Sequence, residues 1–487
     1  MNKTNFFSFF LGLGILFLFI LLPQPEGLSR EAMYAAGVTL LMAVWWIGEA
    51  IPIYATAFAP LVLFPLLGIE TAGETAENYG HNYVLMLLGG FMLAKAIEVH
   101  QLHKRIALLI IRYLGNSRIR IMLSFMLATA FLSMWIANVA VTLLMLPIAL
   151  AIVQKDENNT TEGNKNFGLA LMLSIAYAAS IGGTGTLVGT PPNMAFAGIL
   201  SEMFPESIEI SFFMWLKIGL PLVILFLPVA WIYLFRFYKI KGRISGSEKI
   251  IHDELSILGK ITKAESRVLF LFILTSLGWI FRKDFIIDDF QIRGWSSLLG
   301  VEDYVHDSTV ALFIAILLFI IPTDNKFSRP LLTWKEAQGI PWGVVMIVGG
   351  GYAIASGFGT TGLAVWLGQS MAFIGHFPTF LILLSVITLM IFITEINSNT
   401  ATANIFLPVF GSMAIASGMD PLMIMIPATF ACSFSFMLPS GTGTNAVVFG
   451  SGRITIPEMA KSGFYFNLVG IIFLTLFMYL YVIPMLN

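Results

Sequence analysis

Apolar runs long enough to cross a membrane recur along the whole chain, and short polar segments separate them. A bilayer-spanning helix needs about 20 mostly apolar residues. Uninterrupted runs of this kind lie near 6–22, 31–50, 53–69, 82–98, 212–238, 268–281, 309–322, 342–357, 359–375 and 457–485. The pattern predicts an all-α polytopic membrane protein.

Further apolar stretches are interrupted near their middle by Gly, Pro, Asn, Ser or Thr, at 119–153, 167–200, 378–416 and 421–450. Backbone inside a membrane must have its hydrogen bonds satisfied, so a broken helix survives there only within protein or beside a cavity. We therefore expect these stretches to surround a site near the middle of the membrane.

Two motifs occur twice, in the same order. The string from Asn138 to Pro147 matches that from Asn399 to Pro408 in its Asn, its Ala and its Leu-Pro ending. Gly-Thr-Pro-Pro-Asn at 189–193 is then matched by Gly-Thr-Gly-Thr-Asn at 441–445. We infer two homologous halves that form an inverted repeat.

The repeat sets the expected domain organisation. An N-terminal span (1–29) precedes the first repeat (30–240), which contains a re-entrant hairpin at 119–153. A linker (241–264) leads to the second repeat (265–487), which contains a re-entrant hairpin at 378–416. The two hairpins are expected to enter the membrane from opposite sides.

Composition supports the membrane assignment and excludes other classes. Hydrophobic residues make up 57% of the 487 residues and charged residues 11%, whereas a typical soluble domain has about 25% charged residues. The net charge of -1 and the lack of a dense basic stretch exclude nucleic acid as a partner. The single cysteine, Cys432, excludes a disulfide within the chain. The lipid bilayer is the expected surrounding.

The distribution of charge predicts the orientation. The segment 236–267 is rich in Lys and Arg, so the positive-inside rule places it in the cytoplasm. The segment 284–307 is rich in Asp and Glu and is expected outside. We expect an integral protein of a bacterial inner (plasma) membrane, with its N-terminus in the cytoplasm and its C-terminus outside.

The polar residues at the breaks can bind an anion and a cation together. A half-helix that starts at a break offers free N–H groups and a partial positive charge, which suit a carboxylate or sulfate. Exposed carbonyls suit a sodium ion, and hydroxyl and amide side chains can serve either ion. Because the breaks contain no Lys or Arg, an anion would be held without fixed charge. A co-bound sodium ion would neutralise part of its charge.

These same residues carry a family resemblance. The string Thr-Glu-Ile-Asn-Ser-Asn-Thr-Ala-Thr-Ala-Asn at 394–404 resembles the signature of the divalent anion:sodium symporter family, the INDY-type carriers of dicarboxylates, citrate or sulfate. Trp-Trp-Ile-Gly-Glu-Ala-Ile-Pro at 45–52, Gly-Thr-Pro-Pro-Asn at 189–193 and Phe-Met-Leu-Pro at 436–439 are also similar to that family. The resemblance runs from residue 30 to the C-terminus.

The resemblance implies a homodimer with about eleven transmembrane helices and two re-entrant hairpins, in which a transport domain moves like an elevator against a scaffold domain. It places a small anionic substrate between the hairpin tips, with sodium as the coupling ion and no other cofactor. The implied substrate-binding residues are Asn138, Val139, Thr190, Asn399, Thr400 and Thr442. The implied sodium residues are Ser133, Ala137, Asn138 and Gly189 at the first site, and Thr394, Ser398, Asn399 and Gly441 at the second.

The chain departs from the family pattern around the first tip. Ala137 and Val139 replace residues with hydroxyls, and Val141 replaces a Thr. In the second half, Gly443 and Thr444 stand where the family has two prolines. Val139 removes a hydroxyl that in relatives contacts a substrate carboxylate, so the substrate or its coupling could differ from the family norm.

The leading hypothesis is a sodium-coupled carrier of succinate- or malate-type dicarboxylates. A sodium-independent exchanger of dicarboxylates, sulfate or citrate is the alternative, because of the hydroxyls missing at 137 and 139. An anion channel would show flux without saturation or coupling. An intramembrane enzyme is disfavoured, since a serine protease needs a facing Ser and His and the broken stretches hold no His in their polar cores.

Overall fold

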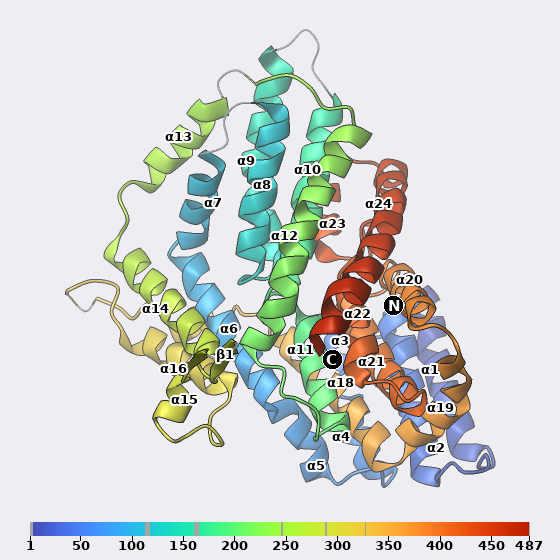
Figure 1. The fold of residues 1–487 in the computed structure, drawn as a ribbon. Helices are drawn as coiled ribbons and strands as arrows, with labels where there is room; N and C mark the ends of the chain where they lie inside the picture. Colours follow the sequence, from blue (N-terminus) through green and yellow to red (C-terminus); the bar gives the residue numbers. More distant parts are fainter. Residues whose placement is uncertain are drawn as a thin grey trace.

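Helices dominate the computed structural model, which describes residues 3–112, 117–159, 165–244, 247–287, 290–326 and 328–486 (Figure 1). Within these residues the β-structure that forms a sheet is one short antiparallel hairpin, β1 (Phe285–Ile287) paired with β2 (Phe290–Ile292). In the same part of the chain, six helical stretches are long and apolar enough to cross a membrane, and shorter apolar helices accompany them. The predicted all-α membrane fold is confirmed.

The first half of the chain forms α1 (Lys3–Leu21), α2 (Arg30–Ile47), α3 (Ile53–Thr56), α4 (Ala59–Leu66), α5 (Ala72–Glu77), η1 (Asn78–Gly80), α6 (Asn82–Val99), α7 (Leu102–Arg112), α8 (Arg118–Ser133), α9 (Asn138–Asn159), α10 (Lys165–Gly183), α11 (Pro191–Met203) and α12 (Phe212–Phe237). The second half forms α13 (Ser247–Leu258), α14 (Lys263–Ile280), α15 (Trp295–Leu298), α16 (Asp307–Ile320), α17 (Trp334–Ala337), α18 (Trp342–Thr360), α19 (Leu363–Met371), η2 (Ala372–His376), α20 (Thr379–Thr394), α21 (Asn399–Ala416), α22 (Pro421–Cys432), α23 (Gly443–Phe449), α24 (Ile456–Phe477), η3 (Met478–Val482) and α25 (Ile483–Leu486).

Each interrupted apolar stretch folds as two helices with a break between them. The breaks separate α8 from α9, α10 from α11, α20 from α21, and α22 from α23. Pro147 and Pro408 lie inside α9 and α21, nine residues after the first residue of each helix. The two hairpins therefore share both the position of the break and the position of the internal proline.

The helices gather in two groups. In Figure 1, α8, α9 and α10 stand side by side in the upper part of the view, and α10 packs against both of its neighbours. At the lower right, α1 packs on α2 and α19 packs on α21. A large apolar core joins most of the chain, and a second core is formed mainly by α1, α2, α18 and α19, with Ala401 and Ile405 of α21.

A buried ion pair joins α8 and α9, the helices of the first hairpin, at the end away from the tip. Arg118 begins α8, and its guanidinium binds the Asp156 carboxylate near the end of α9 at 2.8 Å. Arg118 also donates to the backbone oxygen of Lys241, at 2.7 Å. Both side chains are buried, so losing either one would leave an uncompensated charge, which typically costs about 3–5 kcal/mol.

One expectation about a span is wrong. The run 359–375 was expected to cross the membrane, but it folds as α19, of nine residues, followed by the 3-10 turn η2. A positive φ of 78° at Gly362 ends the preceding helix and turns the chain, because this backbone region favours glycine. The run 53–69 contains α3 and α4, with Ala57 and Phe58 between them, and Ile53–Leu66 together form a short apolar helical stretch.

Candidate functional site

The first hairpin tip lies between the last residue of α8 and the first residue of α9. The Ser133 hydroxyl, at the end of α8, donates to Oδ1 of Asn138 at 2.6 Å. The Thr186 hydroxyl, from the loop between α10 and α11, donates to the backbone oxygen of Met134. The loop at 134–137 is thus fixed from both sides by hydroxyl groups, and Asn138 is oriented by a partner five residues before it.

The second hairpin tip repeats this arrangement. The Thr394 hydroxyl, at the end of α20, lies 2.8 Å from Oδ1 of Asn399, which begins α21. The same hydroxyl is 2.8 Å from the backbone oxygen of Cys432 in α22. The hydroxyl and the asparagine are again five residues apart, so each tip contains one hydroxyl–asparagine pair.

A second pair of helix starts, at α11 and α23, is held by two equivalent asparagines. Nδ2 of Asn193 donates to the backbone oxygens of Gly183 at 3.1 Å and Thr186 at 2.7 Å. Nδ2 of Asn445 donates to those of Ser435 at 3.1 Å and Leu438 at 3.0 Å. The acceptors lie ten and seven residues before the asparagine in both cases. Each asparagine therefore closes the loop that leads into its own helix.

All four breaks face one cavity of about 510 Å³. The predicted substrate-binding residues line it: Asn138, Val139, Thr190, Asn399, Thr400 and Thr442. Of the predicted sodium residues, Ala137, Gly189, Ser398 and Gly441 also line it. Ser133 and Thr394 are buried behind the tips, where they contact Asn138 and Asn399. The structure thus brings the predicted residues of both halves together; their roles stay predictions.

The cavity lining combines residues of the tips with apolar residues of other helices. Trp46, Ile47, Tyr54, Phe91 and Val344 are among these apolar residues. Among the described residues that line this cavity there is no Lys or Arg, and Glu49 is the one charged residue. The N-termini of α9, α11 and α21 meet at the cavity, and their first-turn N–H groups have no partner within the helix. An anion here would be bound by N–H dipoles and neutral side chains.

The oxygen atoms at each tip fit a sodium ion. A hard cation takes oxygen ligands from carbonyl, amide and hydroxyl groups. At the first tip, Oδ1 of Asn138 and the Ser133 hydroxyl provide such oxygens, and the backbone near Gly189 lies close by. At the second tip, Asn399 and Thr394 provide the same groups. The donor set at each tip therefore suits the coupling ion that the sequence predicts.

One contact joins two positions that depart from the family pattern. A Cβ placed on Gly443, where the family has proline, would lie 2.5 Å from Cγ2 of Val139. The Val139 side chain, which is 40% exposed, therefore fills the space that a larger residue at 443 would need. The apolar residue at the first tip and the glycine at the start of α23 fit each other as a pair.

Sequence reasoning assigned no site role to two residues of the second tip. Asn397 is buried and lines the cavity, and its Oδ1 accepts from the backbone N–H of Ser398 at 2.9 Å. Its Nδ2 has no partner in the described structure. Glu395 is buried beneath the tip, where its carboxylate accepts several hydrogen bonds. The sequence signal for both residues was their position in the 394–404 string, next to residues to which site roles were assigned.

Arg453 lies shortly after the loop at 441–445, but its side chain is paired away from the cavity. Its guanidinium binds the Glu157 carboxylate at 2.6 Å. Arg453 does not line the cavity, so the structure gives it no contact with a bound anion.

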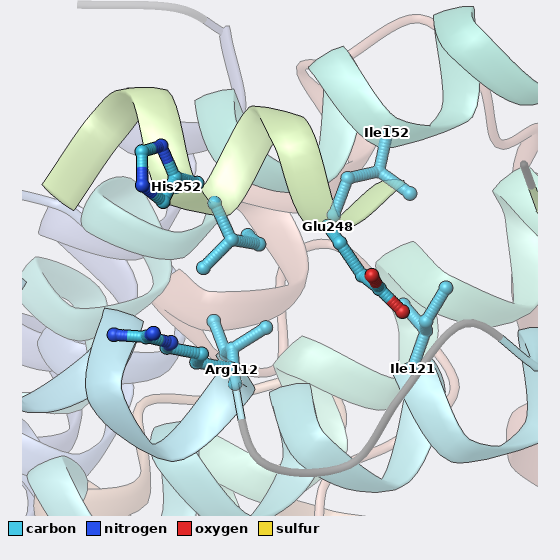
Figure 2. Close-up of a pocket in the computed structure, with 7 residues that line it drawn as sticks. Arg112, Ile121, Ile152, Glu248 and His252 are labelled. Atoms are coloured by element: carbon cyan, nitrogen blue, oxygen red, sulfur yellow. The ribbon is translucent and has the colours of Figure 1, made fainter. Parts of the chain in front are cut away.

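A separate cavity of about 250 Å³ lies beneath α13 (Figure 2). Its lining is largely isoleucine, with Arg112, Glu248 and His252 as the polar members. Figure 2 shows the Arg112 guanidinium and the Glu248 carboxylate pointing away from each other. These polar groups do not converge on one ligand, so the cavity between the tips is the better candidate site.

Two solved structures share the fold. The Neisseria gonorrhoeae protein MtrF, described in a study of a class of antimetabolite efflux pumps, superposes with a TM-score of 0.57 at 11% identity, over 97% of this chain and 95% of that chain. The Alcanivorax borkumensis YdaH transporter superposes with a TM-score of 0.59 at 14% identity, over 91% and 98%. At these identities the similarity concerns the fold alone. The shared fold and the long apolar helices are those of a polytopic integral membrane protein.

Sequence similarity then gives the family. Residues 3–487 match the family described as the sodium:sulfate symporter transmembrane region, and the chain belongs to it. A Staphylococcus saprophyticus protein named sodium-dependent dicarboxylate transporter SdcS is 41% identical over 496 residues, covering 100% of this chain and 93% of that protein. A Staphylococcus aureus protein of the same name is 41% identical over 481 residues, covering 96% and 90%. These relatives are transporters rather than enzymes, and the predicted family is confirmed.

Proposed function

We propose that this protein is a secondary active transporter that carries succinate- or malate-type dicarboxylates together with sodium ions. The observation that carries the proposal is the single cavity on which both hairpin tips converge, with one hydroxyl–asparagine pair at each tip. The names of the staphylococcal relatives support the substrate class and the coupling ion.

The arrangement of the tips suits an anion with two carboxylates. Asn138 and Asn399 approach the cavity from opposite hairpins, so each can bind one end of a short dicarboxylate. Because no Lys or Arg lines the cavity in the described part of the chain, a bare dianion would bind weakly. Sodium ions beside the asparagines would supply the missing positive charge, so anion binding and cation binding would be coupled by Coulomb attraction.

A sodium-independent exchanger is the second candidate, and Val139 favours it. Val139 lines the cavity and exposes an apolar surface where its counterpart Thr400 offers a hydroxyl. If the first tip bound no sodium ion, the protein could instead exchange one anion for another, which moves no net charge across the membrane.

Uptake of radiolabelled succinate into proteoliposomes separates the two candidates. A symporter accumulates succinate in response to an inward sodium gradient and needs no internal dicarboxylate. An exchanger ignores the gradient and requires preloaded succinate or malate. No uptake in either condition would contradict the proposed substrate, and sulfate and citrate would be the next anions to measure.

We also propose the assembly and the motion that the family resemblance implies. The halves 30–240 and 265–487 would form an inverted repeat, supported by the matched bonds of Asn193 and Asn445. The protein would be a homodimer in which the hairpins move as an elevator, in a bacterial plasma membrane. Cross-linking of paired cysteines on the moving and the static helices would test the motion.

A further inference from the structure

We infer that Glu395 is a positioning residue whose buried negative charge makes the second sodium site stronger than the first. The inference rests on the proposed sodium coupling and adds that the two sites, although built from similar pairs, are not equivalent.

The Glu395 side chain is 3% exposed and is surrounded by donors. Its Oε1 accepts from Nδ2 of Asn467 at 2.7 Å, and its two oxygens together accept from the backbone N–H groups of 436–438 at 2.7–3.1 Å. The Ser435 hydroxyl donates to Oε2 at 3.0 Å. Backbone and amide N–H groups can only donate, and an ionised carboxylate only accepts. The geometry therefore fits an ionised Glu395.

This charge lies directly behind the second tip. Glu395 follows Thr394 in the chain, and Thr394 contacts Asn399. A Cβ placed on Gly441, which lines the cavity, would lie 3.0 Å from Oε2 of Glu395 and 3.1 Å from its backbone oxygen. Because residue 441 has no side chain, the Glu395 carboxylate and the Ser435 hydroxyl that donates to it pack directly behind the Gly441 backbone, which lines the cavity.

The first half has an apolar pair in the corresponding place. Met134 follows Ser133 as Glu395 follows Thr394. A Cβ on Gly185 would lie 3.1 Å from Cε of Met134 and 3.1 Å from Cγ2 of Val223. Val223 and Asn467 each lie four residues after a glycine, Gly219 or Gly463, that packs closely on the loop of its own half.

The two loops are consequently stabilised in different ways. In the first half, the N–H groups of Thr184 and Gly185 donate to the backbone oxygens of Ile181 and Gly182, at 3.2 and 2.9 Å. In the second half, the N–H groups of 436–438 donate to the Glu395 carboxylate instead. The carboxylate thus fixes the loop before Gly441 and also adds a negative charge that the first half does not have in this place.

A cation at the second tip therefore gains an attraction that a cation at the first tip does not. Coulomb energy falls with distance and is weakly screened in a partly buried site. The same charge would stabilise a cation before any anion is present. We expect the second site to fill first, and the first site to bind sodium more weakly until the substrate is present.

The test is a titration of the purified protein with sodium in the absence of substrate. Binding is measured as a shift in melting temperature, and choline chloride is the control for ionic strength. We expect two apparent affinities in the wild type. Glu395→Gln should weaken the tighter one by about tenfold, whereas Glu395→Asp, which keeps the charge, should retain most of it. Glu70→Gln is the matched control, because Glu70 is also a buried carboxylate, bound to Ser356 and Thr75 away from the cavity.

Uptake measurements separate a charge effect from a structural one. At saturating sodium, Glu395→Gln should leave the succinate KM close to the wild-type value. An unchanged sodium affinity in folded Glu395→Gln, or equal losses for sodium and succinate, would overturn the inference while leaving sodium coupling intact. A wild type that carries succinate without any sodium effect would overturn both.

A second pair of variants decides the matter if Glu395→Gln does not fold. Thr394→Ala and Ser133→Ala each remove one hydroxyl at one tip. The tighter sodium phase should disappear in Thr394→Ala and persist in Ser133→Ala. The opposite assignment would overturn the inference.

Discussion

Asn138 and Asn399 are the residues on which the proposed site depends most, since each is oriented by a hydroxyl five residues before it and faces the cavity. We predict that Asn138→Ala or Asn399→Ala lowers succinate uptake by at least about a hundredfold, because a hydrogen bond to a charged group contributes about 1.5–3 kcal/mol and each amide would also lose its sodium contact. Uptake and gel-filtration profiles should be measured together. Asn78→Ala, at a buried Asn outside the cavity, should retain uptake; full activity of either tip variant would refute the site.

Val139 is the residue that most distinguishes this chain from its family pattern. Val139→Thr keeps nearly the same shape against Gly443 and adds a hydroxyl in the cavity. We predict that it lowers the succinate KM by about tenfold, the lower end of what one hydrogen bond to a charged group provides. Thr400→Val, the reciprocal change at the second tip, should raise KM. If neither variant changes KM, the anion contacts other groups.

At the scale of elements, the starts of α11 and α23 depend on single asparagine side chains. Asn445→Ala would remove the side-chain donor to the backbone oxygens of Ser435 and Leu438, of which Leu438 keeps the Gly441 N–H. A buried group left without its hydrogen bond costs about 1–3 kcal/mol, so we predict a lower melting temperature and a lower rate of uptake.

The same prediction applies to the equivalent asparagine of the first half. Asn193→Ala should have an effect of similar size, because its bonds to Gly183 and Thr186 have the same spacing. Differential scanning fluorimetry of both variants measures the effect. A large effect in one half and none in the other would contradict equivalent roles for the two asparagines.

At the scale of the whole molecule, the orientation in the membrane follows from two oppositely charged segments. The basic linker is expected in the cytoplasm and the acidic segment outside. Lys260 and Tyr304 are exposed residues of these two segments, and the single cysteine, Cys432, is fully buried. The chain is therefore suited to cysteine labelling, because its own thiol should react little.

We predict that an impermeant maleimide labels Tyr304→Cys in intact cells. It should label Lys260→Cys only after the cells are permeabilised, and the unmodified chain should show only background labelling in both conditions. Gel fluorescence measures the outcome. The reverse pattern would invert the predicted topology and place the C-terminus in the cytoplasm.

The sequence by itself determined the membrane class, most of the helices and the family. These depend on local properties of the chain. A long apolar run predicts a membrane-spanning helix whatever its neighbours are, and the repeated asparagine motifs mark helix breaks that cannot face lipid. The exception, 359–375, failed because apolar composition alone does not show where a glycine such as Gly362 ends a helix.

Only the tertiary structure decided which residues from distant parts of the chain contact the motifs. It brought both tips to one cavity, showed that Val139 packs against Gly443, and surrounded Glu395 with donors from 435–438 and Asn467. These partners are 40 to 304 residues apart in the chain. No local pattern specifies such contacts, because they depend on how helices from both halves pack.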